Sequence, residues 1–356
     1  MNNSLVSKNT ANGPKSELPF KEKLSRFLKS QQGWLFVLPA VALMIIFTFY
    51  PIASAFVNAL KENYSRLASV GGGKGYAGWG FENFYVVFTG TSSSKYQDIT
   101  IPTGGANFVQ CLVNTMILTF ISVPLSTLLA LLISVALNSI KPLQKAFQTV
   151  FFLPYLTNAL AMGAVFATFF TIIGHRNNVD SYGLMNNLIQ LFGGTPIDWI
   201  SNTTTQKWEI GNVVIPYTKY FVMVIYEVWS GLPFKILILF SSLQSVNKQY
   251  YDAAKVDGAS KSKILWKITT PLISPMLSYL LITGIMGGMK QYSAVVGVFG
   301  QDMGGDYQMG TMVGYIYQYL GNGYYGYAYA GSLILFAIIM VITVINLQVS
   351  KKRVHY

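Results

Sequence analysis

Charged residues are scarce in this sequence of 356 residues, because Asp, Glu, Lys and Arg together make up only 11% of it. A soluble globular domain carries about 25%. Hydrophobic residue types make up 52% of the chain, and they stand in long uninterrupted blocks rather than at the spacing of a half-buried helix or strand. This pattern is typical of a chain solvated by lipid, and it excludes an ordinary soluble domain.

Cysteine and histidine are also nearly absent. The single Cys111 excludes an intramolecular disulfide framework and a multi-cysteine metal site, and packing is its expected role. His175 and His355 are the only two histidines, which argues against histidine catalysis or a histidine metal site. The run Gly71–Gly75 lacks the spacing and the Ser or Thr of a phosphate-binding loop. We therefore expect no catalytic residue, no metal and no bound cofactor in this chain.

Six segments are long and apolar enough to cross a bilayer, which takes about 20 residues. The fourth of them contains Glu227 and Lys235, and the fifth contains Lys290. The sequence therefore predicts an all-α integral membrane protein with six transmembrane helices. The six segments are Gly33–Leu60, Phe108–Ile140, Phe147–Gly174, Tyr217–Val246, Pro275–Val298 and Gly326–Val349.

The distribution of Lys and Arg predicts which side of the membrane each loop faces. With both ends inside the cell, the inner segments hold 16 of the 25 Lys and Arg residues and the outer loops hold seven. Positive residues concentrate on the cytoplasmic side of membrane proteins. Both termini are therefore predicted to be cytoplasmic. The net charge of +12 is then mostly an orientation signal, and we expect no nucleic-acid partner.

The predicted organisation has three parts. A cytoplasmic tail, residues 1–32, contains a basic amphipathic helix over Leu18–Gln31 that is expected on the inner membrane surface. The six-span domain covers residues 33–350, and a basic cytoplasmic tail covers residues 351–356. Two outer loops are long, and the second contains a short interfacial helix over Tyr182–Phe192.

The inner loop after the fourth span, residues 247–275, has the pattern of two short helices. Tyr250–Val256 predicts one or two helical turns, and Gly258 can adopt the left-handed conformation that ends such a helix. A second helix is expected over Ser260–Ile268, and Pro271 is expected to stop it. Two such helices on the cytoplasmic face are shaped to sit in a groove of another protein.

This loop resembles the docking loop of binding-protein-dependent ABC importer permeases, whose pattern is E-A-A-x-x-D-G-A followed by an aromatic residue, Ile and two prolines. The resemblance implies that the loop docks into a cleft of an ATPase subunit and transmits nucleotide-driven closure to the spans. Asp252 stands where the family usually has Glu, so the charge is kept on a shorter side chain. The matching positions are Asp252, Ala253, Ala254, Asp257, Gly258, Ala259, Ile268, Pro271 and Pro275.

Further motifs extend the resemblance over most of the chain, toward the first of the two permeases of a maltose-type importer. It implies a type I ABC importer permease fold in a bacterial or archaeal cytoplasmic membrane. It also implies a second permease subunit, two ATPase subunits that bind ATP–Mg, an external solute-binding protein and a sugar substrate, with the oligosaccharides as the favoured class. The motifs are Leu38-Pro39, Pro51, Asn114-Thr115, Phe151 to Tyr155, Trp229 with Pro233, and Gly326 to Ala330.

Charged residues inside spans mark a solute pathway or a buried pair. Glu227 and Lys290 are expected at similar depth, so contact with solute and an ion pair between them both stay open. Each lies on a helix face that mixes small, polar and apolar groups, which suits a sugar. Lys235 is expected to extend to the inner surface. The candidate pathway residues are Glu227, Ser230, Gly231, Phe234, Thr283, Met286, Gly287 and Lys290.

The region before the last span is rich in tyrosine, and most of these residues are expected to form an aromatic belt at the membrane interface. The alternatives are stacking on sugar rings and contact with a docked binding protein. The tyrosines concerned are Tyr307, Tyr315, Tyr317, Tyr319, Tyr324, Tyr325 and Tyr327.

Three other functions are alternatives to a sugar permease. The first is an importer of a non-sugar solute; a strongly cationic cavity around Lys290 would favour an anion, but Glu227 argues against that. A membrane enzyme acting on lipid-linked sugars would need acidic clusters or histidines at an interface, and the close cytoplasmic pair Asp252 and Asp257 lies in the docking loop. A scaffold without a pathway leaves the charges within the spans unexplained.

Overall fold

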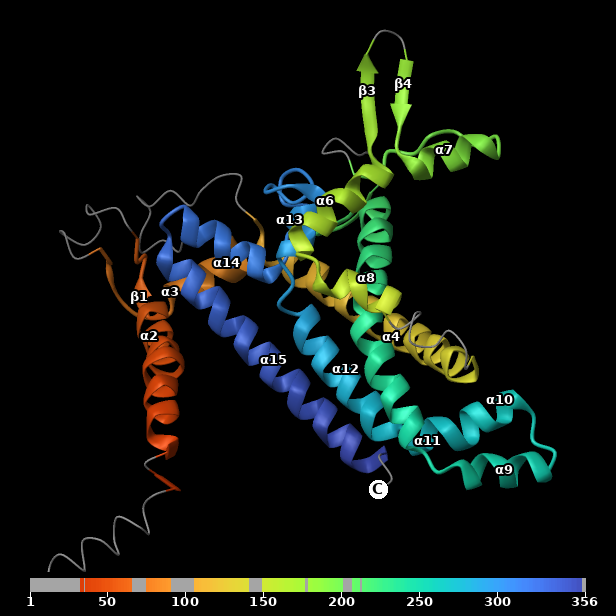
Figure 1. Cartoon of the computed structure of the whole chain (residues 1–356). Coiled ribbons are helices and arrows are strands. Elements are labelled where there is room, and N and C mark those ends of the chain that lie inside the picture. The colour runs from red at the N-terminus through yellow and green to blue at the C-terminus, as the bar shows by residue number, and fades with distance from the viewer. Residues whose placement is uncertain are drawn as a thin grey trace, which may run out of the picture. The chain divides into compact units, whose positions relative to one another are not determined.

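The computed structural model describes residues 33–34, 36–65, 75–90, 106–140, 149–176, 179–200, 207–211 and 213–353. The chain divides into two units, Met1–Ala55 and Phe56–Tyr356, and each is described here by itself. Figure 1 shows the helices and strands, coloured from red at the N-terminus to blue at the C-terminus. The predicted tail 1–32 with its surface helix, and the last three residues of the tail 351–356, lie outside the described residues.

The predicted first span is helical over Phe36–Ala59. It contains a π turn, η1 (Ile45–Phe49), which is followed by α2 (Tyr50–Ala59). Pro51 explains the irregularity, because proline lacks an N–H and its ring clashes with the carbonyl one turn back. The wider turn, in which the N–H of Tyr50 bonds to the carbonyl of Ile45, accommodates it.

Three more predicted spans form as continuous helices: α4 (Phe108–Ser139), α8 (Tyr217–Ser245) and α15 (Tyr325–Arg353). With Phe36–Ala59, they are the four helices of the described residues that could each cross a membrane alone. The side chain of Asn107 starts α4 by accepting the N–H groups of Val109 and Gln110. α4 and α8 lie against each other, with α12 beside them (Figure 1).

The third and fifth predicted spans are broken, so the prediction of single helices there is wrong. The third consists of Thr149–Leu156, which includes η3 (Leu153–Leu156), and α6 (Ala159–Phe170), inclined by 107°. The fifth consists of α12 (Ser274–Gly288) and α13 (Ser293–Phe299), with the helix interrupted between them. Two bent pairs of helices occur in the described residues: Thr149–Leu156 with Ala159–Phe170, and Lys261–Leu272 with Ser274–Gly288 at 72°. If each of these bent pairs is one span, the described part of the chain has six spans.

Both breaks have a local cause in the sequence. Asn158 begins α6 as a cap, because its side chain accepts the N–H of Leu160 at 2.8 Å. At the end of α12, the consecutive glycines Gly287 and Gly288 weaken the helix, and the polar Lys290 and Gln291 follow after Met289. An apolar run long enough for one helix therefore folds as two.

Short elements occupy the predicted outer loops. Helix α7 (Leu184–Leu191) confirms the short helix expected at Tyr182–Phe192. Two further short helices, α3 (Glu82–Thr89) and α14 (Met312–Gly321), were not expected. The fold is thus mostly helical, but the all-α prediction missed three antiparallel hairpins. These pair β1 (Lys61–Glu62) with β2 (Gly78–Trp79), β3 (Ile172–Arg176) with β4 (Val179–Tyr182), and β5 (Trp208–Ile210) with β6 (Val213–Ile215).

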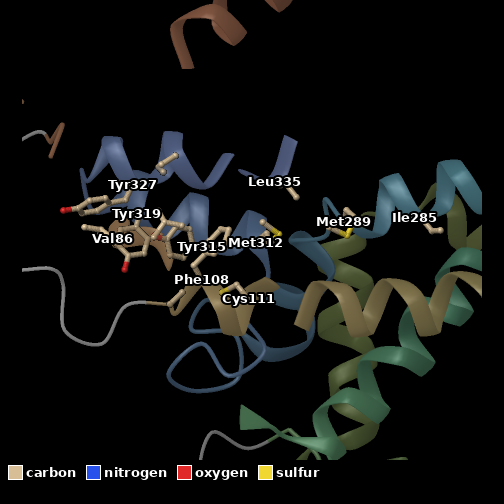
Figure 2. Close-up of a cluster of buried hydrophobic side chains, with 14 of the residues drawn as sticks. Val86, Phe108, Cys111, Ile285, Met289, Met312, Tyr315, Tyr319, Tyr327 and Leu335 are labelled. Carbon is tan, nitrogen blue, oxygen red and sulfur yellow. The ribbon is translucent and has the colours of Figure 1, made fainter. Parts of the chain in front are cut away.

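A buried cluster rich in tyrosine joins α3, α4, α14 and α15 (Figure 2). The rings of Tyr315 and Tyr319 lie 4.4 Å apart, and Tyr327 meets Tyr319 edge-on at 5.9 Å. All three side chains are buried, so the predicted interfacial belt is wrong for them. The reason is α14, which packs on α15 and turns these rings inward.

Two glycines permit the close crossing of α6 and α13. A Cβ atom on Gly163 would come 2.9 Å from the Cα of Gly297, and one on Gly297 would come 2.5 Å from the carbonyl oxygen of Leu160. Small residues of this kind let membrane helices approach backbone to backbone. The crossing holds the second piece of each broken span in place.

Candidate translocation site

The predicted docking loop begins with α9 (Lys248–Val256), which Asn247 caps by accepting the N–H of Gln249. The helix ends in a Schellman turn, in which Gly258 bonds to the carbonyl of Lys255 and Ala259 bonds to that of Ala254. Gly258 has a φ of +69°, the left-handed region. The prediction that Gly258 ends this helix is confirmed.

The second half of the loop differs from the prediction. Ser260 caps α10 (Lys261–Ile264), which continues through a π turn, η4 (Leu265–Thr269), into α11 (Thr270–Leu272). Pro271 therefore does not stop the helix, contrary to the prediction. The N–H of Thr270 bonds to the carbonyl of Leu265 across the π turn, the same arrangement that precedes Pro51 in the first span.

The docking loop presents side chains to solvent at the positions that resemble the permease motif. Asp252 and Ala253 are exposed on α9, Asp257, Gly258 and Pro271 are exposed beyond it, and Ala259 and Ile268 are half-buried. Ala254 is buried. Asp252 forms an exposed ion pair with Lys255 at 3.2 Å within its own helix, which is worth at most about 1 kcal/mol.

Both helix breaks face one cavity of about 390 Å³ beside the middle of α8. Such a volume lies in the range of small-molecule sites. The phenol of Tyr226, on α8, donates to the carbonyl of Ala159 at 3.0 Å and so ties α8 to the first residue of α6. The lining residues are Pro154, Tyr155, Thr157, Ala159, Met162, Tyr226, Trp229, Ser230, Lys290, Gln291, Tyr292, Ser293 and Ala294.

Two of the candidate pathway residues, Ser230 and Lys290, line this cavity from opposite elements. Phe234 stacks on Tyr155 with ring centroids 5.7 Å apart, at the edge of the same space. Gly231 instead faces Ser126 of α4, 3.6 Å from the place of its missing Cβ. Thr283, Met286 and Gly287 are not among the lining residues.

Glu227 is buried behind the cavity wall rather than in it. Ser122 of α4 and Gln291 supply the polar groups that face its carboxylate. Glu227 Oε1, Ser122 Oγ and Gln291 Oε1 each lack a hydrogen-bond partner among the described residues. No ion pair joins Glu227 to Lys290 in this part of the chain, so that alternative is not formed within the single subunit.

Lys235 does not extend to the membrane surface, so that prediction is wrong. It is buried, and its ammonium donates to the hydroxyl of Ser126 and to the carbonyl of Val123. Gly231 and Gly284 leave the room for it, since a Cβ atom on either would lie within 4 Å of the ammonium nitrogen. Lys235 therefore joins α8 to α4 at the level where α12 crosses them.

Lys219 was counted with the outer loops from its sequence, but it lies in the first turn of α8 and is fully buried. Its ammonium donates to the carbonyl of Gly304 and, at 3.0 Å, to the side-chain oxygen of Gln308. Asn114 of α4 donates to the carbonyls of Gln308 and Gly310, both at 2.8 Å. These bonds fix the loop between α13 and α14 on the second turn of α4 and the first turn of α8.

Sequence reasoning missed most of the cavity. Tyr155, Thr157 and Ala159 line it because the third span breaks there, and Gln291 and Tyr292 do so because the fifth span breaks. A signal was available, since Pro154 and Asn158 punctuate one apolar run and Gly287, Gly288 and Lys290 punctuate the other. Discontinuous helices commonly build binding sites in transporters.

The comparisons with known proteins agree with this geometry. Residues 182–355 match the model of the family described as "Binding-protein-dependent transport system inner membrane component". This part of the chain is similar to the members of that family. It contains the docking loop, α8, both pieces of the fifth span and the last span, and the predicted resemblance is confirmed.

Curated relatives extend the similarity to the rest of the chain. The arabinooligosaccharides transport system permease protein AraP of Bacillus subtilis (strain 168) is 27% identical over 326 residues, which is 91% of this chain and 90% of that protein. The trehalose/maltose transport system permease protein MalF of Thermococcus litoralis is 23% identical over 328 residues, 92% of this chain and 96% of that one. Both are named as transport permeases rather than enzymes.

The fold has a solved counterpart. A chain in the crystal structure of a bacterial alginate ABC transporter, in complex with an alginate pentasaccharide-bound periplasmic protein, superposes with a TM-score of 0.69. It is 20% identical, and the match covers 93% of this chain and 98% of that one. The chain therefore has the fold of an ABC transporter permease and is a multi-pass membrane protein.

Proposed function

We propose that this chain is one permease subunit of an ATP-driven ABC importer for a sugar, with the oligosaccharides as the favoured class. The observation that carries the proposal is the cavity between the two helix breaks, midway along α8. Ser230 lies about 16 Å along α8 from Lys219 and about 22 Å from its C-terminal end. A solute can reach a site at that depth, from either side of the membrane, only by passing between the spans.

The chemistry of the cavity suits a sugar. Trp229, Tyr155 and Tyr292 offer aromatic surface for the apolar faces of a ring, and Ser230, Gln291 and Lys290 offer partners for hydroxyl groups. Lys290 is exposed in the isolated chain and forms no ion pair in the described part of it, so its ammonium can serve the solute. The names of the relatives, which include transporters of arabinooligosaccharides, trehalose and maltose, favour the same class.

The docking loop follows the C-terminal end of α8 and is the proposed contact with the ATPase. Val256 leaves 88% of its side chain exposed on α9, and Trp266 leaves 49% exposed on the second helix. Exposed apolar side chains on a pair of short helices can pack into a hydrophobic groove of a partner protein. Closure of the ATPase dimer on ATP–Mg would move this loop. The movement would reach the cavity through the two flanking helices, because α8 carries cavity residues and α12 ends next to others.

A single permease provides half of such a pathway. We propose that a second permease subunit covers the exposed faces of Thr283 and Gly287 on α12, that two ATPase subunits bind the docking loops, and that an external binding protein delivers the solute. We propose that both termini and the docking loop face the cytoplasm, because these segments hold most of the Lys and Arg residues and positive residues concentrate on the cytoplasmic side.

The first experiment is a mild-detergent pull-down of the tagged chain from its native membrane, with mass spectrometry of its partners. Recovery of an ATPase and a second multi-span protein supports the proposal, and recovery of a membrane enzyme complex contradicts it. Uptake of labelled neutral sugars and of labelled anions into cells with and without the chain then separates a sugar importer from an importer of another solute. Loss of anion uptake alone would refute the sugar assignment.

A further inference from the structure

A second cavity, of about 410 Å³, lies at the end of α8 opposite the docking helices. The loop between α13 and α14 forms one wall, and Lys219 in the first turn of α8 holds that loop. The docking loop begins after Ser245, about 39 Å farther along the helix. Figure 1 shows α9 and α10 at the end of α8 farthest from α13. This second cavity is called the outer cavity below.

The walls of the outer cavity are mostly polar. Gln301, Asp302, Gln318 and Asn322 line it with three amides and a carboxylate. One amide is fixed, because the side-chain oxygen of Gln318 accepts the N–H of Ala106 at 2.7 Å. Lys and Arg do not occur among the lining residues, all of which belong to the described part of the chain. The surface therefore offers partners to neutral hydroxyl groups and opposes a second negative charge.

A pair of tyrosines forms the aromatic side of the outer cavity. The rings of Tyr292 and Tyr317 stack with centroids 4.6 Å apart and an angle of 21° between their planes. Tyr317 keeps 53% of its surface exposed. Tyr307 stands nearby, and burial together with the Asp302 carboxylate raises the pKa of its hydroxyl, which stays a hydrogen-bond donor. A flat ring beside hydroxyl partners is the combination that a sugar requires.

The loop that builds this wall is strained and rigidly held. Met303, Asp306 and Tyr307 adopt φ values of 48°, 45° and 56°, the left-handed region that residues other than glycine avoid. Strain of this kind persists where surrounding bonds enforce it, and it concentrates at functional sites. Here the bonds come from Lys219 in the first turn of α8 and from Asn114 in the second turn of α4.

The outer cavity adjoins the central one. Tyr292 lines both, because it stands at the break between α12 and α13. We infer that the outer cavity is a second sugar subsite, which binds one ring of a neutral oligosaccharide while an adjoining ring occupies the central cavity. The inference rests on the proposed function and narrows its substrate to sugars of two or more uncharged rings, since Asp302 disfavours a uronic acid.

Uptake by the complete importer in proteoliposomes tests this, with arabinose, arabinobiose, arabinotriose, maltose and maltotriose as probes. Tyr317→Ala should raise KM for the probes of two or three rings about three- to tenfold and leave that for arabinose unchanged. Tyr85→Ala, which removes another tyrosine that is 49% exposed, should change neither. Equal effects of Tyr317→Ala on all lengths, or none, overturn the subsite while sugar uptake still supports the proposed function.

Cysteine labelling gives a second reading that does not depend on turnover. The only cysteine, Cys111, is buried, so Asn322→Cys creates one accessible thiol in the outer cavity. Maltotriose or arabinotriose should slow its reaction with an impermeant maleimide, whereas Tyr85→Cys should react at the same rate with and without them. If the sugar-free binding protein slowed the reaction of this thiol and neither trisaccharide did, the outer cavity would be a contact for the binding protein. That result would overturn the inference. Uptake of none of the probes by the unaltered importer would contradict the proposed function itself.

Discussion

Gly163 of α6 and Gly297 of α13 meet so closely that a Cβ atom on Gly163 would lie 2.9 Å from the Cα of Gly297. The two helices are the second pieces of the two broken spans, and each supplies residues to the central cavity. Because neither glycine has a Cβ atom, the two helices can approach this closely. The position of the cavity wall therefore depends on the absence of a side chain at both positions.

We expect Gly297→Ala to push these helices apart, because its Cβ would come 2.5 Å from the carbonyl oxygen of Leu160. Overpacking of this kind costs about 1–3 kcal/mol. The unfolding midpoint of the solubilised complex should fall, and KM for the transported sugar should rise. Gly33→Ala is the control, since its Cβ would meet nothing within 4 Å among the described residues. An equal fall in both variants would contradict the role of the crossing.

Lys219 allows a second prediction, on the loop between α13 and α14. Lys219→Met removes the donor to Gly304 and Gln308, and each lost bond to a charged group is worth about 1.5–3 kcal/mol. Hydrogen exchange of the backbone amides over residues 300–310 should become faster. Lys207→Met is the matched control, because Lys207 pairs with Glu209 on the surface, where the two side chains are 35% and 61% exposed. Unchanged exchange in Lys219→Met would show that the loop is held by Asn114 alone.

The sequence predicted α4, α8 and α15 because nothing interrupts their apolar runs with a cap or paired glycines. It failed at the two breaks, since hydropathy averages over a window and does not register a capping Asn158 or a Gly287-Gly288 pair. It also failed at Lys219 and Lys235. A buried lysine needs acceptors from distant segments, and those acceptors, Gly304 and Ser126, are known only from the fold. Only a small part of the candidate site was predicted, for the same reason. Ser230 and Lys290 stand out in the sequence as polar or charged residues within spans, whereas Thr157 and Gln291 line the cavity because of the breaks.

A third prediction concerns which residue Glu227 is coupled to. Its carboxylate faces Gln291 and makes no ion pair with Lys290 in the described part of the chain. In double-mutant cycles on the unfolding free energy, Glu227→Gln and Gln291→Leu should be coupled by about 0.5–3 kcal/mol. Glu227→Gln and Lys290→Ala should add to within about 0.5 kcal/mol.

The same variants distinguish a structural from a solute-binding Lys290. Lys290→Ala should change sugar-stimulated ATPase activity while leaving the amount of assembled complex unchanged, because the residue lines the cavity and is exposed. A large coupling between Glu227 and Lys290, together with poor assembly of Lys290→Ala, would instead indicate a pair that forms only in the complete importer.

The last prediction separates the backbone of the docking loop from its side chains. Gly258 has a φ of +69°, and an added Cβ would meet nothing within 4 Å among the described residues, so within this chain a substitution there acts through the backbone conformation. The left-handed region costs a β-branched residue at least about 1–2 kcal/mol, whereas Asn tolerates it. Gly258→Val should therefore open the Schellman turn and change the angle between α9 and α10. Membrane insertion should be normal, but sugar should no longer stimulate ATP hydrolysis and uptake should fall. Gly258→Asn should keep sugar-stimulated ATP hydrolysis and uptake near those of the unaltered importer. If Gly258→Asn and Gly258→Val abolished the coupling of ATP hydrolysis to uptake equally, the ATPase contact would require the small size of Gly258 rather than its φ.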